Sequence, residues 1–140
     1  MTPAEREAFL AGVHVGVVGI DDGDRAPLTV PVWYAYEPGG EVRFITGGDS
    51  RKAQCLERAG RASLCAQTET APYQYVSVEG SVTIDPAVDT DERRAIAHRY
   101  LGPELGDAYY EGTAADAAAS VTVRLRPERW LTVDYGKLFA

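Results

Sequence analysis

The segment from Thr46 to Lys52, which reads Thr-Gly-Gly-Asp-Ser-Arg-Lys, contains residues suited to binding an anion. Its two glycines follow an expected strand, and a helix is expected to begin at Asp49 or Ser50. Free backbone N–H groups and the positive end of a helix dipole favour a negative group at such a point. Arg51 and Lys52 fall in the first turn, where cations oppose the dipole at a cost of roughly 0.3–1 kcal/mol each. A bound phosphate would offset that cost.

A second interpretation of the same segment needs no ligand. The side chains of Arg51 and Lys52 can extend into water or pair with a nearby acidic residue. The segment also lacks the Gly-Lys-Ser or Gly-Lys-Thr ending of a nucleotide-binding P-loop. Both interpretations stay open on the sequence alone.

A proline interrupts the expected strand Leu28–Tyr36. Because proline cannot donate a hydrogen bond to a neighbouring strand, Pro31 predicts an edge strand or a bulge. Alternation places Val30 and Val32 on one face of this strand, and Pro31 and Trp33 on the other. A planar ligand could lie along the opened edge. Alternatively, this is an ordinary edge strand with Trp33 in the core.

Aromatic residues also open the longest expected strand, at Tyr73 and Tyr75. Alternation puts both tyrosines on one face with Ser77 and Glu79. Such a face is typical of a solvent-exposed surface, a binding site or a dimer interface. The pattern alone does not separate these three.

The histidines and cysteines predict neither a catalytic side chain nor a metal site. His14 lies in an apolar strand, which is typical of a core histidine, and His98 lies among arginines on the expected exposed face of a helix. Cys55 and Cys65 have no zinc-ligand spacing and no adjacent histidine. This pattern fits an enzyme whose chemistry belongs to a bound cofactor, and it fits a binding protein equally well.

Length and charge narrow the class of protein. With 140 residues, we expect one domain over residues 1–140. The 14 basic and 21 acidic residues give a net charge of −7, without the basic stripe of a nucleic-acid-binding protein. No apolar run reaches the roughly 18 residues that span a bilayer, and the charged first residues do not resemble a secretory signal. We therefore expect a cytoplasmic protein with reduced thiols and no membrane or nucleic-acid partner.

The hydrophobic periodicity predicts about seven strands and three or four small helices, and so a mainly β fold. The first helix has a capped start in Thr2, Pro3 and Glu5. Tight turns join the first three strands, which predicts an antiparallel meander, and the last two strands predict a hairpin. Such a chain suits a closed or nearly closed antiparallel barrel with helices at its rim. In chain order, the expected elements are helix Thr2–Gly12, strands Val13–Ile20, Leu28–Tyr36 and Glu41–Thr46, helix Ser50–Ala59, strands Arg61–Thr68 and Tyr73–Ile84, a helix from Thr90 to about Leu101, a helical region at Pro103–Ala119, and strands Val121–Leu125 and Arg129–Tyr135.

Six segments of the chain occur together, in the same order, in a known family. They are Phe9-Leu10, Thr29–Trp33, Phe44–Thr46, Asp49–Lys52, Arg61–Leu64 and Tyr75–Gly80. Together they resemble the pyridoxamine 5'-phosphate oxidase-like split β-barrel family, and within it the small flavin/deazaflavin oxidoreductases of the B branch. The likeness covers residues 9–84, with looser agreement over residues 124–135. It implies an FMN-binding-like antiparallel split barrel that forms a homodimer with two cofactor sites at the interface.

The resemblance also implies which residues bind the cofactor. Ser50, Arg51 and Lys52 would hold its phosphate. The ring would lie against the strand that contains Val30, Pro31, Val32 and Trp33, with Thr46 and Gly47 nearby. Tyr73, Tyr75 and Ser77 would approach the cofactor bound mainly by the partner chain. Catalysis would be hydride transfer between this ring and a small-molecule substrate stacked on it.

The expected cofactor follows from positions at which this chain differs from the FMN-using members of the family. FMN-using vitamin oxidases have an arginine near the positions of Thr29 and Val30, where this chain has none, and a basic continuation past the last strand. Shorter relatives often use F420, a deazaflavin with a phosphate and an acidic oligoglutamate tail. Arg43, Arg51, Lys52 and Arg58 could serve such a tail.

We therefore expect an F420-dependent reductase that acts on a small conjugated or polycyclic compound. The alternatives are an FMN-binding flavoprotein similar to pyridoxamine phosphate oxidase, a non-catalytic cofactor- or haem-binding protein, and an empty structural dimer.

Overall fold

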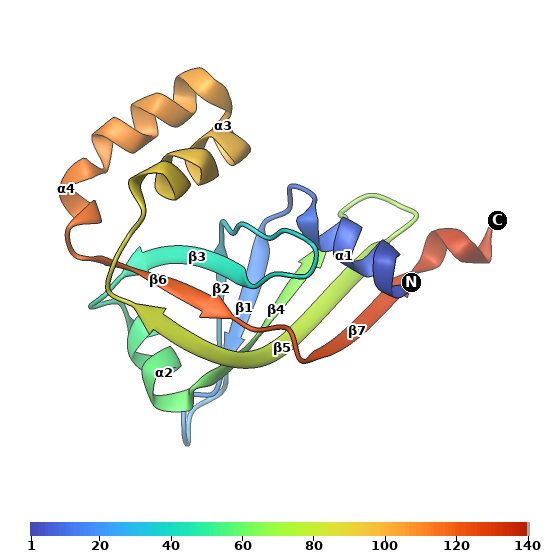
Figure 1. The fold of residues 1–140 in the computed structure, drawn as a ribbon. Helices are drawn as coiled ribbons and strands as arrows, with labels where there is room; N and C mark the ends of the chain where they lie inside the picture. Colours follow the sequence, from blue (N-terminus) through green and yellow to red (C-terminus); the bar gives the residue numbers. More distant parts are fainter. Residues whose placement is uncertain (140) are drawn as a thin grey trace.

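The computed structural model describes residues 1–139, within which seven strands form one curled antiparallel sheet (Figure 1). The strands are β1 (Gly16–Ile20), β2 (Leu28–Val32), β3 (Val42–Gly47), β4 (Arg61–Gln67), β5 (Gln74–Asp85), β6 (Ser120–Leu125) and β7 (Arg129–Asp134). The helices are α1 (Pro3–Ala11), α2 (Arg51–Ala59), α3 (Thr90–Gly112), α4 (Ala114–Ala117) and a final 3₁₀ turn (Tyr135–Leu138). The expected mainly β architecture, with helices around a curled antiparallel sheet, is confirmed.

The long strand β5 organises the sheet. Along one edge it pairs with β4, and along the other it pairs first with β7 and then with β6. The order continues from β4 through β1 to β2, and from β6 to β3. Figure 1 shows β5 running from beside α1 to a position below β6.

Alternating side chains of these strands fill the interior of the curled sheet. In β4, Ala62, Leu64 and Ala66 are buried while their neighbours are not, which is the period of a half-buried strand. Val76 and Val78 of β5 are buried too, as their alternation with Tyr75 and Ser77 predicts. Each large apolar side chain removed from water contributes about 1.5–3 kcal/mol to folding.

The first helix is tied to this interior by its capped start and its last turn. The Thr2 side chain accepts a hydrogen bond from the backbone of Glu5, and the Glu5 side chain accepts one from the backbone of Thr2, which confirms the expected capping box. At the other end, Leu10 is fully buried and its carbonyl oxygen accepts a hydrogen bond of 2.7 Å from the hydroxyl of Tyr34.

The predicted three-strand meander is wrong. β1 and β2 pair as expected, but β3 pairs with β6, and a single bridge between Ala35 and Arg43 links it to the chain after β2. The expected strand to Tyr36 ends early, at Val32. The backbone N–H of Tyr34 donates to the hydroxyl of Tyr100, in α3, at 3.1 Å. This N–H is therefore not free to pair with a neighbouring strand.

The predicted hairpin of the last two strands is also wrong, since β6 and β7 pair one after the other with the same edge of β5. The connection does not reverse direction. Arg126 and Glu128 donate backbone hydrogen bonds of 2.9 Å to Ser81 and Glu79, so the chain keeps following β5. Gly80 makes this close crossing possible: a Cβ there would overlap the carbonyl oxygen of Arg126 and lie 2.8 Å from its carbonyl carbon.

The segment from Thr90 to Gly112 folds as two helical halves that meet at Gly102, whose φ of 82° is left-handed. Pro103 opens the second half, in agreement with the expected second helical region. The cap differs from expectation, because the side chain of Asp89, rather than Thr90, accepts the first N–H groups, from Asp91 and Glu92. None of the helices in residues 1–139 is long and apolar enough to cross a membrane.

We predict that Gly80→Ala destabilises the protein by more than the roughly 1–3 kcal/mol typical of an overpacked site, because the added methyl group meets backbone that cannot rotate away. Gly112→Ala is the matched control, since its added Cβ meets nothing within 4 Å apart from its chain neighbours and its own helix. Urea denaturation of both variants measures the two free energies of unfolding. Equal stability of Gly80→Ala and the wild type would contradict the close crossing.

Candidate functional site

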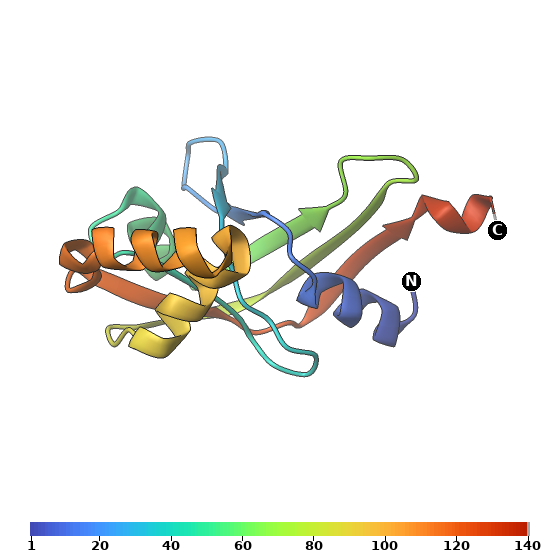
Figure 2. The same cartoon turned by 90° about the horizontal axis from the view of Figure 1, so that it is seen from above.

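A pocket of about 510 Å³ lies between the strands and the segment formed by α3 and α4. Figures 1 and 2 show this helical segment over the end of the sheet that contains β3 and β6. One wall comes from the first strands and includes Val15, Pro31 and Val32. The opposite wall comes from α3, whose buried Ile96 and Ala97 face the sheet.

The polar end of the pocket forms where β3 passes into α2. Gly47 ends β3, and the Ser50 side chain caps α2 by accepting a hydrogen bond of 3.1 Å from the backbone of Ala53. The helix stops at Gly60, whose φ of 67° is left-handed, as the sequence predicts. Thr46 and Gly47 line the pocket, and Lys52 joins them from the first turn of α2.

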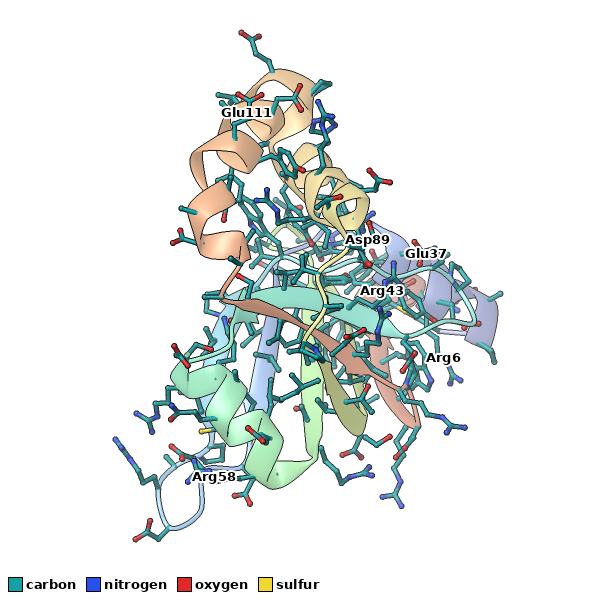
Figure 3. The ribbon with its side chains drawn as sticks, turned by 60° about the vertical axis from the view of Figure 1, so that its left-hand side comes forward. Arg6, Glu37, Arg43, Arg58, Asp89 and Glu111 are labelled. Carbon is teal, nitrogen blue, oxygen red and sulfur yellow. The ribbon has the colours of Figure 1, made fainter. Side chains whose placement is uncertain are left out.

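Arg51 turns away from this pocket toward the loop between β1 and β2. Its guanidinium pairs with the carboxylate of Asp22, which is only 8% exposed, and Arg58 reaches the same carboxylate at 3.3 Å. The hydrogen bond from Arg51 holds the pKa of Asp22 below its usual range. Figure 3 shows α2, with Arg58 marked, on the opposite side of β3 from α3. The cation of Arg51 is thus balanced inside the protein, by pairing with a nearby acidic residue.

Lys52 has no such partner among residues 1–139, in which no ion pair or hydrogen bond involves its ammonium group. Its side chain is half-buried, and this burial lowers its pKa. A cation in that position would be stabilised by an anion that enters the pocket. Of the four cations considered for an acidic tail, the other three are paired, since Arg43 contacts Glu37 at 2.8 Å and Glu92 at 2.5 Å.

Aromatic side chains form the other end of the pocket. Trp33 stacks on Tyr100 with a ring-centroid distance of 5.1 Å, and Tyr109 lies 5.2 Å from Trp33. Trp33 is therefore packed against α3 rather than in the core of the sheet. Pro31 lies in β2, at one end of the strand order, which confirms the edge position predicted from its missing N–H.

The pocket brings together half of the residues predicted to bind a cofactor, namely Pro31, Val32, Trp33, Thr46, Gly47 and Lys52. Val30 instead packs against the core, Ser50 is occupied as a helix cap, and Arg51 faces Asp22. Tyr73, Tyr75 and Ser77 lie on or just before β5, outside this pocket, so their role stays a prediction.

The sequence patterns did not indicate that α3 and α4 contribute to the pocket. Arg93, Tyr109, Thr113 and Asp116 all line the pocket. The neighbours of His98 were expected on an exposed face, yet Arg93 and Arg99 are half-buried. The apolar pair Ile96 and Ala97 did predict an inward face one turn after Arg93. A basic residue at that helical spacing from an apolar pair is the signal that could have identified it.

One row of mostly apolar side chains crosses the outer face of the sheet and reaches the edge of the pocket. The strand register places Pro31, Val17, Cys65, Ser77 and Leu131 in one row across five strands. Val17 and Leu131 are exposed, and the thiols of both cysteines are free, as expected. A row of this kind, with an exposed apolar side chain at several positions, is typical of an interaction surface. Pro31 belongs both to this row and to the pocket.

We predict that Asp22→Asn lowers the melting temperature at pH 7, because it leaves two arginines without their carboxylate. Since the pKa of Asp22 is lowered on folding, its stabilising contribution is present above the ordinary carboxyl pKa of about 3.9 and is lost as the pH falls further. The difference from the wild type should therefore shrink toward pH 3. Thermal denaturation at pH 7 and pH 3 tests this, with the exposed Asp24→Asn as control. A difference that is independent of pH would contradict the ion pair.

Several solved structures of other proteins share this fold. No curated protein matches the sequence. A conserved hypothetical protein from Mycobacterium tuberculosis has a similar structure, with 25% identity, a TM-score of 0.78, and an alignment that covers 100% of this chain and 89% of that one. A protein named F420 reductase is 23% identical, with a TM-score of 0.73 over 89% of this chain and 94% of that one. A FAD-binding protein from Mesorhizobium loti is 19% identical, with a TM-score of 0.67 over 94% and 92% of the two chains.

The amino-acid sequence also matches a known protein family. The model of the family described as Pyridoxamine 5'-phosphate oxidase matches residues 2–134, which include every strand and the whole pocket. The structural neighbours have the split barrel of that family. The chain therefore belongs to the pyridoxamine 5'-phosphate oxidase family.

Proposed function

We propose that this chain is an F420-dependent oxidoreductase that transfers a hydride between bound deazaflavin and a small conjugated or polycyclic compound. The observation that carries the proposal is Lys52, a half-buried cation without a partner in residues 1–139, at the polar end of a pocket whose other end is aromatic. Phosphate at one end and a planar ring at the other are the features of a flavin or deazaflavin.

The residues present fit such a group. A pocket of about 510 Å³ with apolar walls and a few polar groups is typical of a cofactor site. When bound, the deazaflavin ring supplies the hydride chemistry, so the protein needs no nucleophile or general base of its own. This agrees with the absence of a predicted catalytic side chain.

The proposed roles follow from position. Lys52 would bind the phosphate, with Thr46 and Gly47 beside it at the start of α2. Pro31 and Trp33 would contact the ring. α3 would exclude water from the reacting face, because its buried Ile96 and Ala97 cover the pocket.

One observation favours F420 over FMN. The part of β2 that lines the pocket is Pro31 and Val32, and no arginine stands at the neighbouring Thr29 or Val30. The structural neighbours include both a protein named F420 reductase and a FAD-binding protein, so the fold itself fits either kind of cofactor. FMN binding by a flavoprotein of the same family is the alternative, which the binding experiment below separates.

We also propose that the active form is a homodimer. The apolar row across the outer face ends at Pro31, so a second copy on this face would lie at the edge of the pocket. Tyr73, Tyr75 and Ser77, which lie at that face, would then approach the cofactor of the other copy. This supports the expectation that each site contains residues of both chains.

We predict that Lys52→Gln weakens F420 binding at least tenfold, since a hydrogen bond to a charged group contributes about 1.5–3 kcal/mol. Lys137→Gln is the matched control, because Lys137 is the other lysine of the chain and pairs with Glu5 at 2.7 Å, away from the pocket. Fluorescence titrations with F420 and, separately, with FMN measure both affinities. Tighter binding of FMN than of F420 by the wild type, or equal F420 affinity of all three proteins, would refute the proposed cofactor or its anchor.

Turnover is tested in the same preparations, by following the oxidation of reduced F420 with a panel of quinones and polycyclic acceptors. We expect oxidation that depends on an added acceptor and is lost in Lys52→Gln below saturating cofactor. Tight F420 binding without turnover of any acceptor would instead identify a non-catalytic binding protein.

For the dimer, we predict that Val17→Asp produces a monomer with weakened F420 binding, because a charge in the middle of the apolar row must be desolvated on association. Light scattering should give twice the chain mass of 15.1 kDa for the wild type and a single mass for the variant. Leu105→Asp, at an exposed position of α3, should stay dimeric. A monomeric wild type would exclude the shared site.

A further inference from the structure

We propose that Arg93 of α3 is a second anion anchor in the pocket, which binds an acidic group of the ligand distinct from the one bound by Lys52. This inference rests on the proposed function and deepens it, because it specifies a cofactor that has carboxylates beyond its phosphate. Arg93 lies outside the six segments quoted for the sequence resemblance, although the family match over residues 2–134 includes it.

Arg93 differs from the neighbouring arginines of α3 because its guanidinium contacts neither a carboxylate nor a backbone carbonyl oxygen in residues 1–139. Arg94 pairs with Asp107 at 2.9 Å, and Arg99 donates to the carbonyl oxygens of Ala11 and Gly12 at 2.7 and 2.6 Å. Arg93 has no ion pair in residues 1–139, although its side chain is half-buried and lines the pocket. Its Nε is enclosed and has no hydrogen-bond partner.

Two contacts hold the guanidinium of Arg93 in place without neutralising it. Its centre lies 3.9 Å over the ring of Tyr110, and its Nη1 donates to the hydroxyl of Thr113 at 3.1 Å. A guanidinium carries five N–H groups. Apart from the one bound to Thr113 and the enclosed one at Nε, three are left for a ligand. A donor fixed in this way loses little rotamer freedom when it binds, which favours affinity.

The polar residues that line the pocket, among them Arg93 of α3 and Lys52 of α2, are called its polar wall below. Arg93 binds Thr113, and α4 then leads to Ser120, which is paired with Gly47 at the end of β3. Lys52 follows in the first turn of α2. One carboxylate, that of Asp116, also lines this wall, so the two cations leave it with a net positive charge in a chain whose total charge is −7.

A ligand with two acidic groups fits this wall better than a ligand with one. FMN ends at its phosphate, and Lys52 beside Gly47 would satisfy that group. F420 continues past its phosphate into carboxylates, which a planar guanidinium binds through two parallel hydrogen bonds. Arg93 would therefore help to discriminate F420 from cofactors that end at the phosphate.

The experiment compares F420 with the same deazaflavin cut after its phosphate, by fluorescence titration of the purified full chain. We expect Arg93→Gln to weaken F420 binding about tenfold and to leave the affinity for the truncated compound within twofold. Lys52→Gln should weaken both. Arg93→Lys should recover part of the F420 affinity, and Asp116→Asn should increase it, because a repelling carboxylate is removed.

Arg94→Gln is the matched control, since it removes a neighbouring arginine that is already paired. It should leave the affinities for both compounds unchanged. If Arg93→Gln weakens both compounds equally, or neither, while the wild type binds F420, the second anchor is wrong and the proposed function stands. If the wild type does not bind F420 at all, both proposals fail.

Discussion

The barrel depends on one edge of β5, with which both β7 and β6 pair. β7 and β6 follow each other along β5, and they can do so because Gly80 lets the chain at Arg126 pass against the backbone of β5. A strand that crosses in this way bends the sheet, since its two halves pair with partners on different parts of the curl. The crossing delivers β6 to β3, and with it Ser120 to Gly47. The polar end of the pocket is therefore a consequence of how β5 is shared.

The positions of the carboxylates determine which cationic side chains stay unpaired and can therefore bind a ligand. Asp22 balances Arg51 and Arg58, Glu37 and Glu92 balance Arg43, and Asp107 balances Arg94. A buried cation left without a carboxylate is costly unless something else compensates it. In an acidic protein, the positive pocket thus arises from the distribution of the acidic side chains and not from an excess of basic ones.

Local features of this chain could be predicted from the sequence because their causes are local. The capping box of Thr2 and Glu5 and the end of α2 before Gly60 each depend on residues a few positions apart. The edge position of Pro31 follows from a missing N–H. Lys52, which the sequence puts in the first turn of α2, does line the pocket, and its role as an anion anchor stays a prediction.

Features that depend on distant contacts escaped prediction. The register of β3 with β6 joins residues separated by more than seventy positions, and the hydroxyl of Tyr100 ends β2 from another part of the chain. Asp22 could not be assigned to Arg51 from spacing, because the loop and the helix meet only in the folded barrel. Arg93 looked like part of a solvated helix face, since charge runs usually are. Its surroundings come from Tyr110 and Thr113, which the turn at Gly102 brings back across it.

The stacking of Trp33 has an optical consequence. The chain has two tryptophans, and only Trp33 lines the pocket, while Trp130 lies on β7 beside Tyr36 and Arg6. Indole emission responds to its immediate environment, and a coloured ring bound in the pocket would accept its excitation energy at contact distance. With Trp130 replaced by phenylalanine, the remaining indole would act as a built-in reporter of occupancy. The residue that shapes the aromatic end of the pocket would thus also make its filling visible without any added label.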